Sequence, residues 1–211
     1  MPSSAHVFKA LPDADHQAQA RQDRQAPRTV LKKYAITGGT GFVGRAVGKQ
    51  LADEGHEAIA LSRRTGTGVD DLDGLERAFA GCDGVIHRAG INSELRGWTY
   101  EQVHVAGTRN VIAATQRTGV RKLVMMSFLR ARPACGSPYH ESKWAAEELV
   151  RASGIDYTVI KAGVVYGAGD HLLNHLTRGL LTLPVFGLVG MRAQPMRPSA
   201  SAISRTCSAP R

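Results

Sequence analysis

The sequence is poor in cysteine and aromatic residues and has no long apolar run. Its three cysteines, Cys82, Cys135 and Cys207, are scattered and odd in number, which excludes a disulfide framework and a CxxC metal knuckle. No stretch reaches the roughly 18–20 apolar residues that a membrane-spanning helix needs. The first residues lack the apolar run of a signal peptide, and Asp13 and Asp15 argue against a mitochondrial presequence. These absences favour a cytoplasmic protein without a membrane span.

Positive charge is concentrated at the two ends of the chain. The net charge is +9, but residues 1–33 and 192–211 carry ten of the 27 basic side chains and three of the 18 acidic ones. Residues 34–191 therefore have a balance of only +2. A nucleic-acid-binding domain would have a broad basic surface, so DNA and RNA are not expected as partners.

The composition divides the chain into a central domain and two tails. Residues 1–29 mix Ala, Gln, Arg, Asp and Pro with almost no apolar periodicity, which predicts a disordered tail. Residues 30–198 are long enough for one domain with a substantial core. Residues 199–211 are rich in Ser, Ala, Arg and Pro, and we expect a second disordered tail there.

Within the central domain, short apolar segments alternate with amphipathic ones. Strands are predicted at 32–37, 57–62, 84–87, 122–127 and 156–160, and helices at 42–54, 72–80, 100–118 and 139–153. Strands that are apolar on both faces and alternate with helices specify an α/β fold with a doubly wound parallel sheet, the Rossmann fold. Such a fold places its ligands at the carboxyl ends of the strands.

A glycine-rich turn lies between the first predicted strand and the first predicted helix. Gly38, Gly41 and Gly44 follow a G-x-x-G-x-x-G pattern, which allows a tight turn and close approach of a pyrophosphate to the backbone. The free N–H groups of the following helix attract anions. The pattern predicts NAD(P) binding by the eight residues Thr37, Gly38, Gly39, Thr40, Gly41, Phe42, Val43 and Gly44.

Two arginines follow the second predicted strand. An NAD site usually has an acidic residue there to bind the ribose 2′-hydroxyl, whereas this chain has Arg63 and Arg64. Guanidinium groups would pair with a 2′-phosphate, which favours NADP over NAD. The alternative is that both arginines are simply solvated in a surface loop.

Several motifs occur in one order along the chain. They are the glycine turn, His87-Arg88-Ala89-Gly90, Ser127, Tyr139-His140-Glu141-Ser142-Lys143 and Lys161-Ala162-Gly163-Val164-Val165-Tyr166-Gly167. This series resembles the short-chain dehydrogenase/reductase superfamily, in particular its extended and atypical branches with the NAD-dependent epimerase/dehydratase group. The resemblance covers roughly residues 32–198.

The resemblance implies a catalytic set of Ser127, Tyr139 and Lys143. Tyr139 and Lys143 are four residues apart on one helical face, so both would reach the same site. A nearby cation would lower the pKa of the phenol and make Tyr139 a general acid/base. Lys143 would also hold the nicotinamide ribose, and Ser127 would orient the reacting oxygen. The alternatives are an amphipathic helix that happens to carry both residues, and a strand-end serine that is satisfied by backbone.

The resemblance also extends the expected cofactor site. The further residues are Asp71, Leu72, Ala89, Gly90, Tyr139, Lys143, Lys161, Ala162, Gly163 and Val164.

The chain departs from the pattern of the superfamily in three places. His104 stands where an asparagine is common, and Ala162 replaces the proline of an Arg/Lys-Pro-Gly segment. Extended members continue beyond this length, so a truncated chain with an incomplete substrate region is one hypothesis.

His171 and His175 have the spacing of metal ligands on a helix, but neighbouring leucines favour an ordinary packed helix, and no metal is expected.

Together these features predict an NAD(P)-dependent oxidoreductase or epimerase/dehydratase that acts on a small molecule by hydride transfer. NADP is the preferred cofactor, with NAD as a possibility, and a homodimer is a possible assembly. Two alternatives remain open at this stage: a non-catalytic NAD(P)-binding sensor or assembly protein, and a truncated inactive copy.

Overall fold

The computed structural model describes residues 30–95, 97–170, 172–182 and 199–200. The strands are β1 (Lys33–Thr37), β2 (Glu57–Leu61), β3 (Gly84–His87), β4 (Lys122–Phe128), β5 (Asp156–Ala162), β6 (Val165–Tyr166) and β7 (Ser199–Ala200). The helices are α2 (Phe42–Asp53), α3 (Leu72–Phe79), α4 (Gly107–Arg117), α5 (Pro138–Arg151) and α6 (Leu172–Thr182). A 3-10 turn, η1, spans Arg63–Thr65, and a π-helical segment, η2, spans Glu101–Ala106 directly before α4.

Five parallel strands form the central sheet in the order β2-β1-β3-β4-β5. The chain runs from β1 outward to β2 and then returns to the other side of β1, so the strand order reverses at β1. In such sheets ligands bind beyond the carboxyl ends of the strands at the point of reversal. The predicted parallel α/β fold is therefore confirmed, and it places the glycine turn, which follows β1, at this point.

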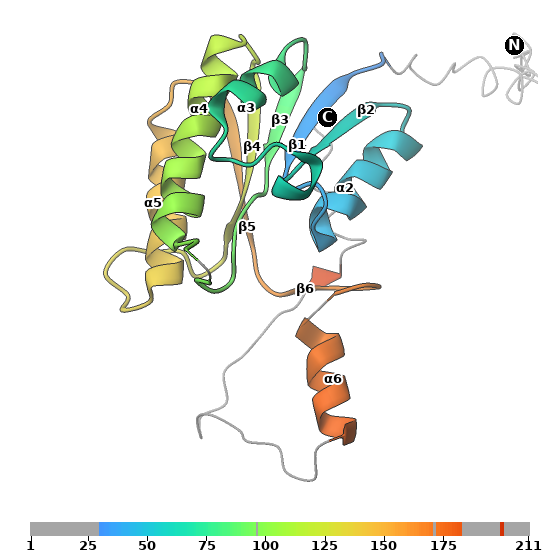
Figure 1. The fold of residues 1–211 in the computed structure, drawn as a ribbon, viewed down its shortest axis with the longest axis vertical. Helices are drawn as coiled ribbons and strands as arrows, with labels where there is room; N and C mark the ends of the chain where they lie inside the picture. The colour runs from blue at the N-terminus through green and yellow to red at the C-terminus, as the bar shows by residue number, and fades with distance from the viewer. Residues whose placement is uncertain (1–29, 96, 171, 183–198, 201–211) are drawn as a thin grey trace, which may run out of the picture. The chain divides into compact units, whose positions relative to one another are not determined.

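Helices cover the two faces of the sheet unequally. Helices α3, α4 and α5 lie on one face and α2 lies on the other (Figure 1). The larger buried cluster includes Leu75 and Phe79 of α3, Val111 of α4 and Val150 of α5. The smaller cluster lies under α2 and contains Ile36, Val43 and Val47. Burial on both faces explains why the strands are apolar without alternation.

The predicted elements match the structure to within a few residues, with three differences. The helix predicted at 100–118 begins with the π-helical segment η2. Ser199–Ala200, placed in a disordered tail by composition, pairs in parallel with β6. Leu176 of α6, which the leucine-rich pattern predicts to be packed, is 41% exposed. The predicted N-terminal tail lies outside the described residues.

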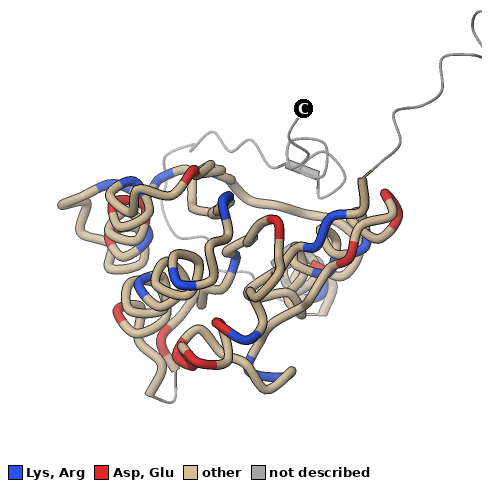
Figure 2. Tube along the Cα trace, turned by 90° about the horizontal axis from the view of Figure 1, so that it is seen from above, with Lys and Arg blue, Asp and Glu red and all other residues tan. Residues whose placement is uncertain are grey.

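Basic and acidic residues are interspersed along the described part of the chain (Figure 2). No described helix combines the length and hydropathy needed to cross a membrane. Within the same residues, no group of three or more His, Cys, Asp and Glu side chains has an arrangement that could hold a metal ion.

Candidate cofactor and active site

The glycine turn brings β1, β3 and α2 into close contact. Gly38 has a φ of +69°, and a Cβ added there would lie 2.9 Å from Cα of Ala89. A Cβ at Gly44 would lie only 2.7 Å from Cα of Gly39 and still closer to the carbonyl oxygen of Gly38. Glycine is therefore required at Gly38 by the left-handed conformation and at Gly44 by the approach of α2 to the turn.

The N-terminus of α2 is open to an anion. Gly41 is its N-cap, no side chain caps it, and its first turn has no acidic residue. The first N–H groups of a helix have no partner within the helix, and its dipole favours negative charge there. A phosphate at this position would complete the hydrogen bonding of the turn.

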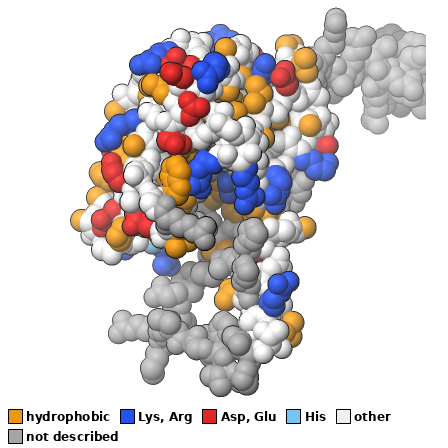
Figure 3. Space-filling model, viewed as in Figure 1, with side chains coloured by type: hydrophobic (Ala, Val, Ile, Leu, Met, Phe, Trp, Pro, Cys, Tyr) orange, Lys and Arg blue, Asp and Glu red, His pale blue; other side chains and the backbone are white. Residues whose placement is uncertain are grey.

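A cavity of about 340 Å³ adjoins the turn, and we call it the glycine-turn pocket. Four arginines line it (Arg45, Arg63, Arg64 and Arg88), whereas Asp70 is its one acidic lining residue among the described residues. A row of basic side chains beside a hollow is visible on this face of the molecule (Figure 3). The pocket therefore favours a ligand with several negative charges.

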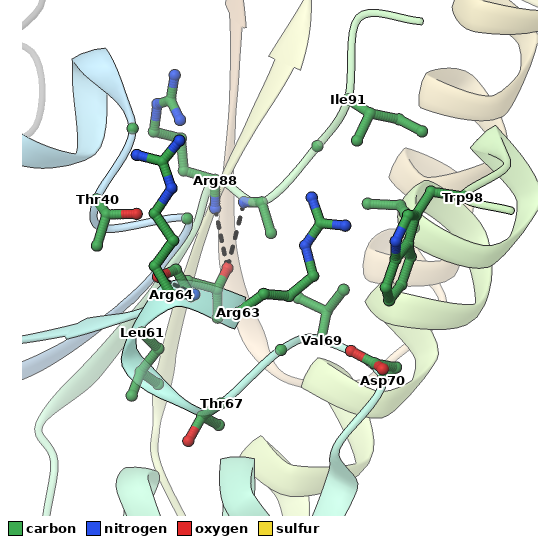
Figure 4. Close-up of a pocket in the computed structure, with 18 of the residues that line it drawn as sticks. Thr40, Leu61, Arg63, Arg64, Thr67, Val69, Asp70, Arg88, Ile91 and Trp98 are labelled. Carbon is green, nitrogen blue, oxygen red and sulfur yellow. Dashed lines mark hydrogen bonds between the residues drawn. The ribbon is translucent and has the colours of Figure 1, made fainter. Parts of the chain in front are cut away.

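Two of these arginines are positioned by local structure after β2. Ser62 caps η1 by accepting hydrogen bonds from the backbone of Arg64 and Thr65, which fixes the direction in which Arg63 and Arg64 leave the strand. Arg63 extends toward Trp98 (Figure 4), and its Cζ lies 4.3 Å from the centroid of the indole ring. This cation–π contact holds Arg63 at the wall of the pocket.

A second cavity of about 630 Å³ contains the predicted catalytic residues, and we call it the Tyr139 pocket. Ser127, Tyr139 and Lys143 line it together with Gly163 and Val164. The residues common to both pockets are Gly41, Phe42, Arg88, Gly90 and Ile91. The two cavities therefore adjoin, and together they form one elongated site along the carboxyl edge of the sheet.

Burial shifts the pKa values of Tyr139 and Lys143 in opposite directions. The pKa of Tyr139 is raised, mainly by burial and further by Tyr100, while Arg88 opposes the increase. Burial lowers the pKa of Lys143 to about 8, and the positive charge of Arg88 contributes to this. The sequence suggested that Lys143 would lower the pKa of Tyr139, but the cation that acts in this direction is Arg88.

Ser127 lies in the Tyr139 pocket, but its proton is directed away from it. Its hydroxyl donates to Oε1 of the buried Glu147 at 2.5 Å. Glu147 also pairs with Arg151 at 2.7 Å and Lys161 at 3.3 Å. Burial alone would raise the pKa of Glu147, but these hydrogen bonds outweigh it and lower the pKa. Ser127 therefore presents acceptor lone pairs, rather than a free donor, to a ligand.

The loop that follows β3 is held by a buried neutral histidine. Thr37 Oγ1 accepts from the N–H groups of residues 88–89 at 3.2 and 3.3 Å, so its own proton points to Nδ1 of His87, 2.7 Å away. Nε2 of His87 lies 2.9 Å from Thr108 Oγ1, which donates to the carbonyl of His104. Burial lowers the pKa of His87 to about 3, so it remains neutral at physiological pH.

His104 links the same loop to α5. Its Nε2 accepts from the N–H of Ile91 at 3.1 Å, so Nδ1 carries the proton and donates to Ser142 Oγ at 2.8 Å. Ser142 in turn donates to the main-chain oxygen of Tyr139 at 2.9 Å. The ring of His104 also stacks on Tyr100 with centroids 5.3 Å apart. The histidine that replaces the usual asparagine thus joins both walls of the Tyr139 pocket.

Most of the residues predicted from the sequence line one of the two pockets. In the glycine-turn pocket these are Thr37, Gly38, Thr40, Gly41, Phe42, Arg63, Arg64, Ala89 and Gly90. In the Tyr139 pocket they are Gly41, Phe42, Val43, Gly90, Ser127, Tyr139, Lys143, Ala162, Gly163 and Val164.

Five predicted residues line neither pocket. Gly39 packs against Ala60, and Gly44 packs against the turn. Asp71 is the N-cap of α3, and Leu72 packs against the larger core cluster. The amine of Lys161 contacts Ala131 and Glu147.

Sequence reasoning missed Arg45, Asp70, Arg88 and Trp98 as lining residues. Arg88 had a detectable signal, because it is a charged residue directly after a buried strand in the segment His87-Arg88-Ala89-Gly90. The sequence contained no signal for Trp98, because this residue reaches the pocket from an irregular loop.

Comparisons with known proteins agree with this geometry. The model of the NAD dependent epimerase/dehydratase family matches residues 34–183. The chain is 31% identical over 150 residues to a ceramide reductase of Caulobacter vibrioides, covering 64% of this chain and 47% of the relative. It is 29% identical over 150 residues to the photosystem II assembly factor Ycf39 of Synechocystis sp., covering 64% and 46%. The chain spans about half the length of these curated relatives.

The fold also matches solved structures. MoeE5 in complex with UDP-glucuronic acid and NAD superposes with a TM-score of 0.68 at 24% identity, covering 82% of this chain and 70% of that one. The open N-terminus of α2, the glycines that a Cβ would clash with, and the cationic pocket lining all fit a dinucleotide. The chain belongs to the NAD dependent epimerase/dehydratase family.

Proposed function

We propose that this protein is an NADP(H)-dependent oxidoreductase in which Tyr139 transfers the proton. The observation that carries the proposal is the elongated site itself, with Arg63 and Arg64 in one pocket and Tyr139 and Lys143 in the adjoining one. The two ends of NADP(H) match these two pockets, because one end is an adenosine that carries a phosphate and the other is the reactive nicotinamide. When bound, the nicotinamide supplies or accepts the hydride.

Tyr139 is suited to act as a general acid toward a carbonyl oxygen. Because burial raises its pKa, the phenol is protonated at neutral pH and can donate. The ring is fixed by edge contacts with Phe128, Tyr100 and His104 at centroid distances of 5.7, 5.6 and 5.6 Å. This packing orients the hydroxyl without using its hydrogen-bonding capacity.

Lys143 and Ser127 have supporting roles in the proposal. The amine of Lys143 makes no hydrogen bond or ion pair with the described residues, so its three donors are available to ribose hydroxyls. Ser127 donates to Glu147, so it can accept from the hydroxyl of an alcohol substrate but cannot donate to a carbonyl.

The lining of the Tyr139 pocket suggests the class of substrate. Ile91, Met126, Phe128 and Val165 give it an apolar wall. A ketone flanked by an apolar group fits this wall, and the similarity to a ceramide reductase points the same way.

The preference for NADP(H) rests on Arg63 and Arg64. Both are exposed side chains in the pocket wall, directly after β2, where no acidic residue stands. An exposed charged hydrogen bond to the 2′-phosphate is worth roughly 1–2 kcal/mol, which corresponds to about tenfold in affinity for each arginine.

Titration of the purified protein with NADPH and NADH tests this preference, with nicotinamide fluorescence as the readout. We expect tighter binding of NADPH, and Arg63→Gln or Arg64→Gln should weaken NADPH about tenfold and leave NADH unchanged. Arg121→Gln is the matched control, because Arg121 directly precedes β4 and so lies at the amino ends of the parallel strands, opposite the site. Equal affinities for the two nucleotides in the unmodified protein would remove the proposed preference.

Tyr139→Phe tests the chemistry. With a panel of apolar ketones and NADPH, this variant should lose turnover and retain nucleotide affinity, because only the phenolic proton is removed. Unchanged turnover would contradict the proposed role of Tyr139.

A second candidate is a nucleotide-binding assembly protein with little turnover, and the similarity to the Ycf39 assembly factor favours it. Nucleotide binding without turnover of any ketone or alcohol tested would favour this candidate.

A further inference from the structure

Arg88 is a cation at the junction of the two pockets. It follows β3 directly, and its backbone N–H donates to the carbonyl oxygen of Thr37 at 3.2 Å and also to Thr37 Oγ1. The end of β1 therefore fixes the position from which the side chain extends. Arg88 lines both pockets, and Figure 4 shows it on the same side of the glycine-turn pocket as Arg64 and Thr40.

The guanidinium group has no partner among the described residues. It takes part in no hydrogen bond or ion pair there, and its Nε is buried without an acceptor. Burial lowers the pKa of Arg88, the phenol of Tyr139 opposes this, and the positive charge of Arg88 in turn lowers the pKa of Lys143. The side chain is half-buried, and a nitrogen that loses its hydration without gaining an acceptor is unfavourable.

The position of this group relative to α2 identifies the anion that fits it. A Cβ added at Gly41 would lie 3.0 Å from Nη1 of Arg88, so the guanidinium faces the N-cap of α2. The free N–H groups of the helix and the Arg88 side chain therefore point toward the same volume. In a dinucleotide that spans both pockets, the group at the centre is the diphosphate.

We propose that Arg88 binds the diphosphate of the dinucleotide, opposite the N-terminus of α2. The inference rests on the proposed NADP(H) function. It means that the diphosphate is held by the Arg88 side chain as well as by the backbone of the glycine turn. Arg88 is distinct from Arg63 and Arg64 in this respect, because its contact is common to NADPH and NADH.

The test compares ligands that share or lack a diphosphate. Arg88→Gln should weaken NADH, NADPH and ADP to a similar extent, about 10–100-fold, because each loses one charged hydrogen-bonding group. Adenosine, which has no phosphate, should bind as it does to the unmodified protein. Arg121→Gln again serves as the control for loss of a basic side chain.

Urea unfolding provides a readout that a purely structural role would not give. Because the guanidinium has no partner, Arg88→Gln without nucleotide should be at least as stable as the unmodified protein. Arg88→Lys, which retains the charge, should recover part of the affinity for ADP and keeps the test valid if the glutamine variant folds poorly.

Three results would overturn the inference. The first is affinity of Arg88→Gln for NADH and ADP equal to that of the unmodified protein, and the second is a loss limited to NADPH. The third is unchanged nucleotide affinity with weaker binding of an anionic substrate, which would place the anion in the Tyr139 pocket. A failure of the proposed function differs from all of these, since the unmodified protein itself would then show no NADPH preference or no turnover.

Discussion

Replacement of Lys143 by methionine should stabilise the protein without nucleotide. The side chain is 7% exposed, and burial lowers its pKa from 10.5 to about 8. The folded state therefore binds this proton less tightly than the unfolded chain does, and stability contributed by Lys143 falls as the pH drops from 10.5 through 8. At pH 7 the difference of about 2.5 pKa units corresponds to about 3 kcal/mol of destabilisation. Methionine has a similar length and no charge.

The pH dependence of the effect identifies its cause. At pH 10 the unfolded chain is itself partly deprotonated at this residue, and the same linkage gives only about 1 kcal/mol. Urea unfolding of Lys143→Met and the unmodified protein at both pH values should therefore show an advantage of about 3 kcal/mol that shrinks to about 1 kcal/mol. Lys49→Met is the control: Lys49 is exposed and pairs with Asp53 at 2.7 Å, so its loss should change stability by less than about 1 kcal/mol.

Lower stability of Lys143→Met at pH 7, or an advantage of the same size at both pH values, would refute the reasoning. The first result would mean that the amine stabilises the fold through its contacts. The second would mean that methionine stabilises by packing alone, without any contribution from a desolvated charge.

Three further predictions concern the supports of the site. Gly44→Ala should destabilise by about 1–3 kcal/mol, because its Cβ would clash with the glycine turn. Gly48→Ala, one helical turn later, should stabilise by about 0.5–1 kcal/mol, because its Cβ would make only an ordinary contact of 3.6 Å with Ile36 Cδ1. Equal effects of the two variants in thermal unfolding would contradict the clash at Gly44. Because His104 has a pKa of about 3 in the folded state and 6.5 as its ordinary value, its contribution is fully present above pH 6.5 and is lost as the pH falls toward 3. From pH 7 to 5 the unmodified protein should lose about 2 kcal/mol more stability than His104→Asn, and parallel pH profiles would argue against a neutral buried His104. Ser127→Ala should destabilise by about 1–3 kcal/mol, because the buried Glu147 loses a hydrogen bond, and unchanged stability in urea would show that this bond is dispensable.

The sequence was sufficient to predict the fold because its local signals agree with one another. Strand β3 was predicted with its observed bounds, and α2 and α3 end within one residue of the predicted positions. Gly55, Gly81 and Gly119, which follow helices, all have positive φ values, as helix-terminating glycines should. The π-helical start at η2, in which Val103, His104 and Val105 are buried, left no such signal.

The pocket lining was less predictable than the fold. Motifs identify residues that share a strand end or a helix face, and on this basis Tyr139 and Lys143 were placed in one cavity with Ser127. They do not show what a side chain contacts across the sheet. The serine was expected to face the reacting oxygen, but Glu147, one helical turn after Lys143, receives its proton.

The site combines two features that oppose stability, and the proposed dinucleotide would offset both. Lys143 is buried with a depressed pKa, and Arg88 is half-buried with an Nε that has no acceptor, so both are charged where desolvation disfavours charge. A protein without a ligand for these groups would gain stability by exchanging them for apolar residues. If a dinucleotide binds there as proposed, its diphosphate offsets the penalty at Arg88, and its ribose hydroxyls accept hydrogen bonds from Lys143. Affinity for the dinucleotide and stability without it should therefore change in opposite directions in variants of Arg88 and Lys143, whereas variants of Gly44 should lose both together.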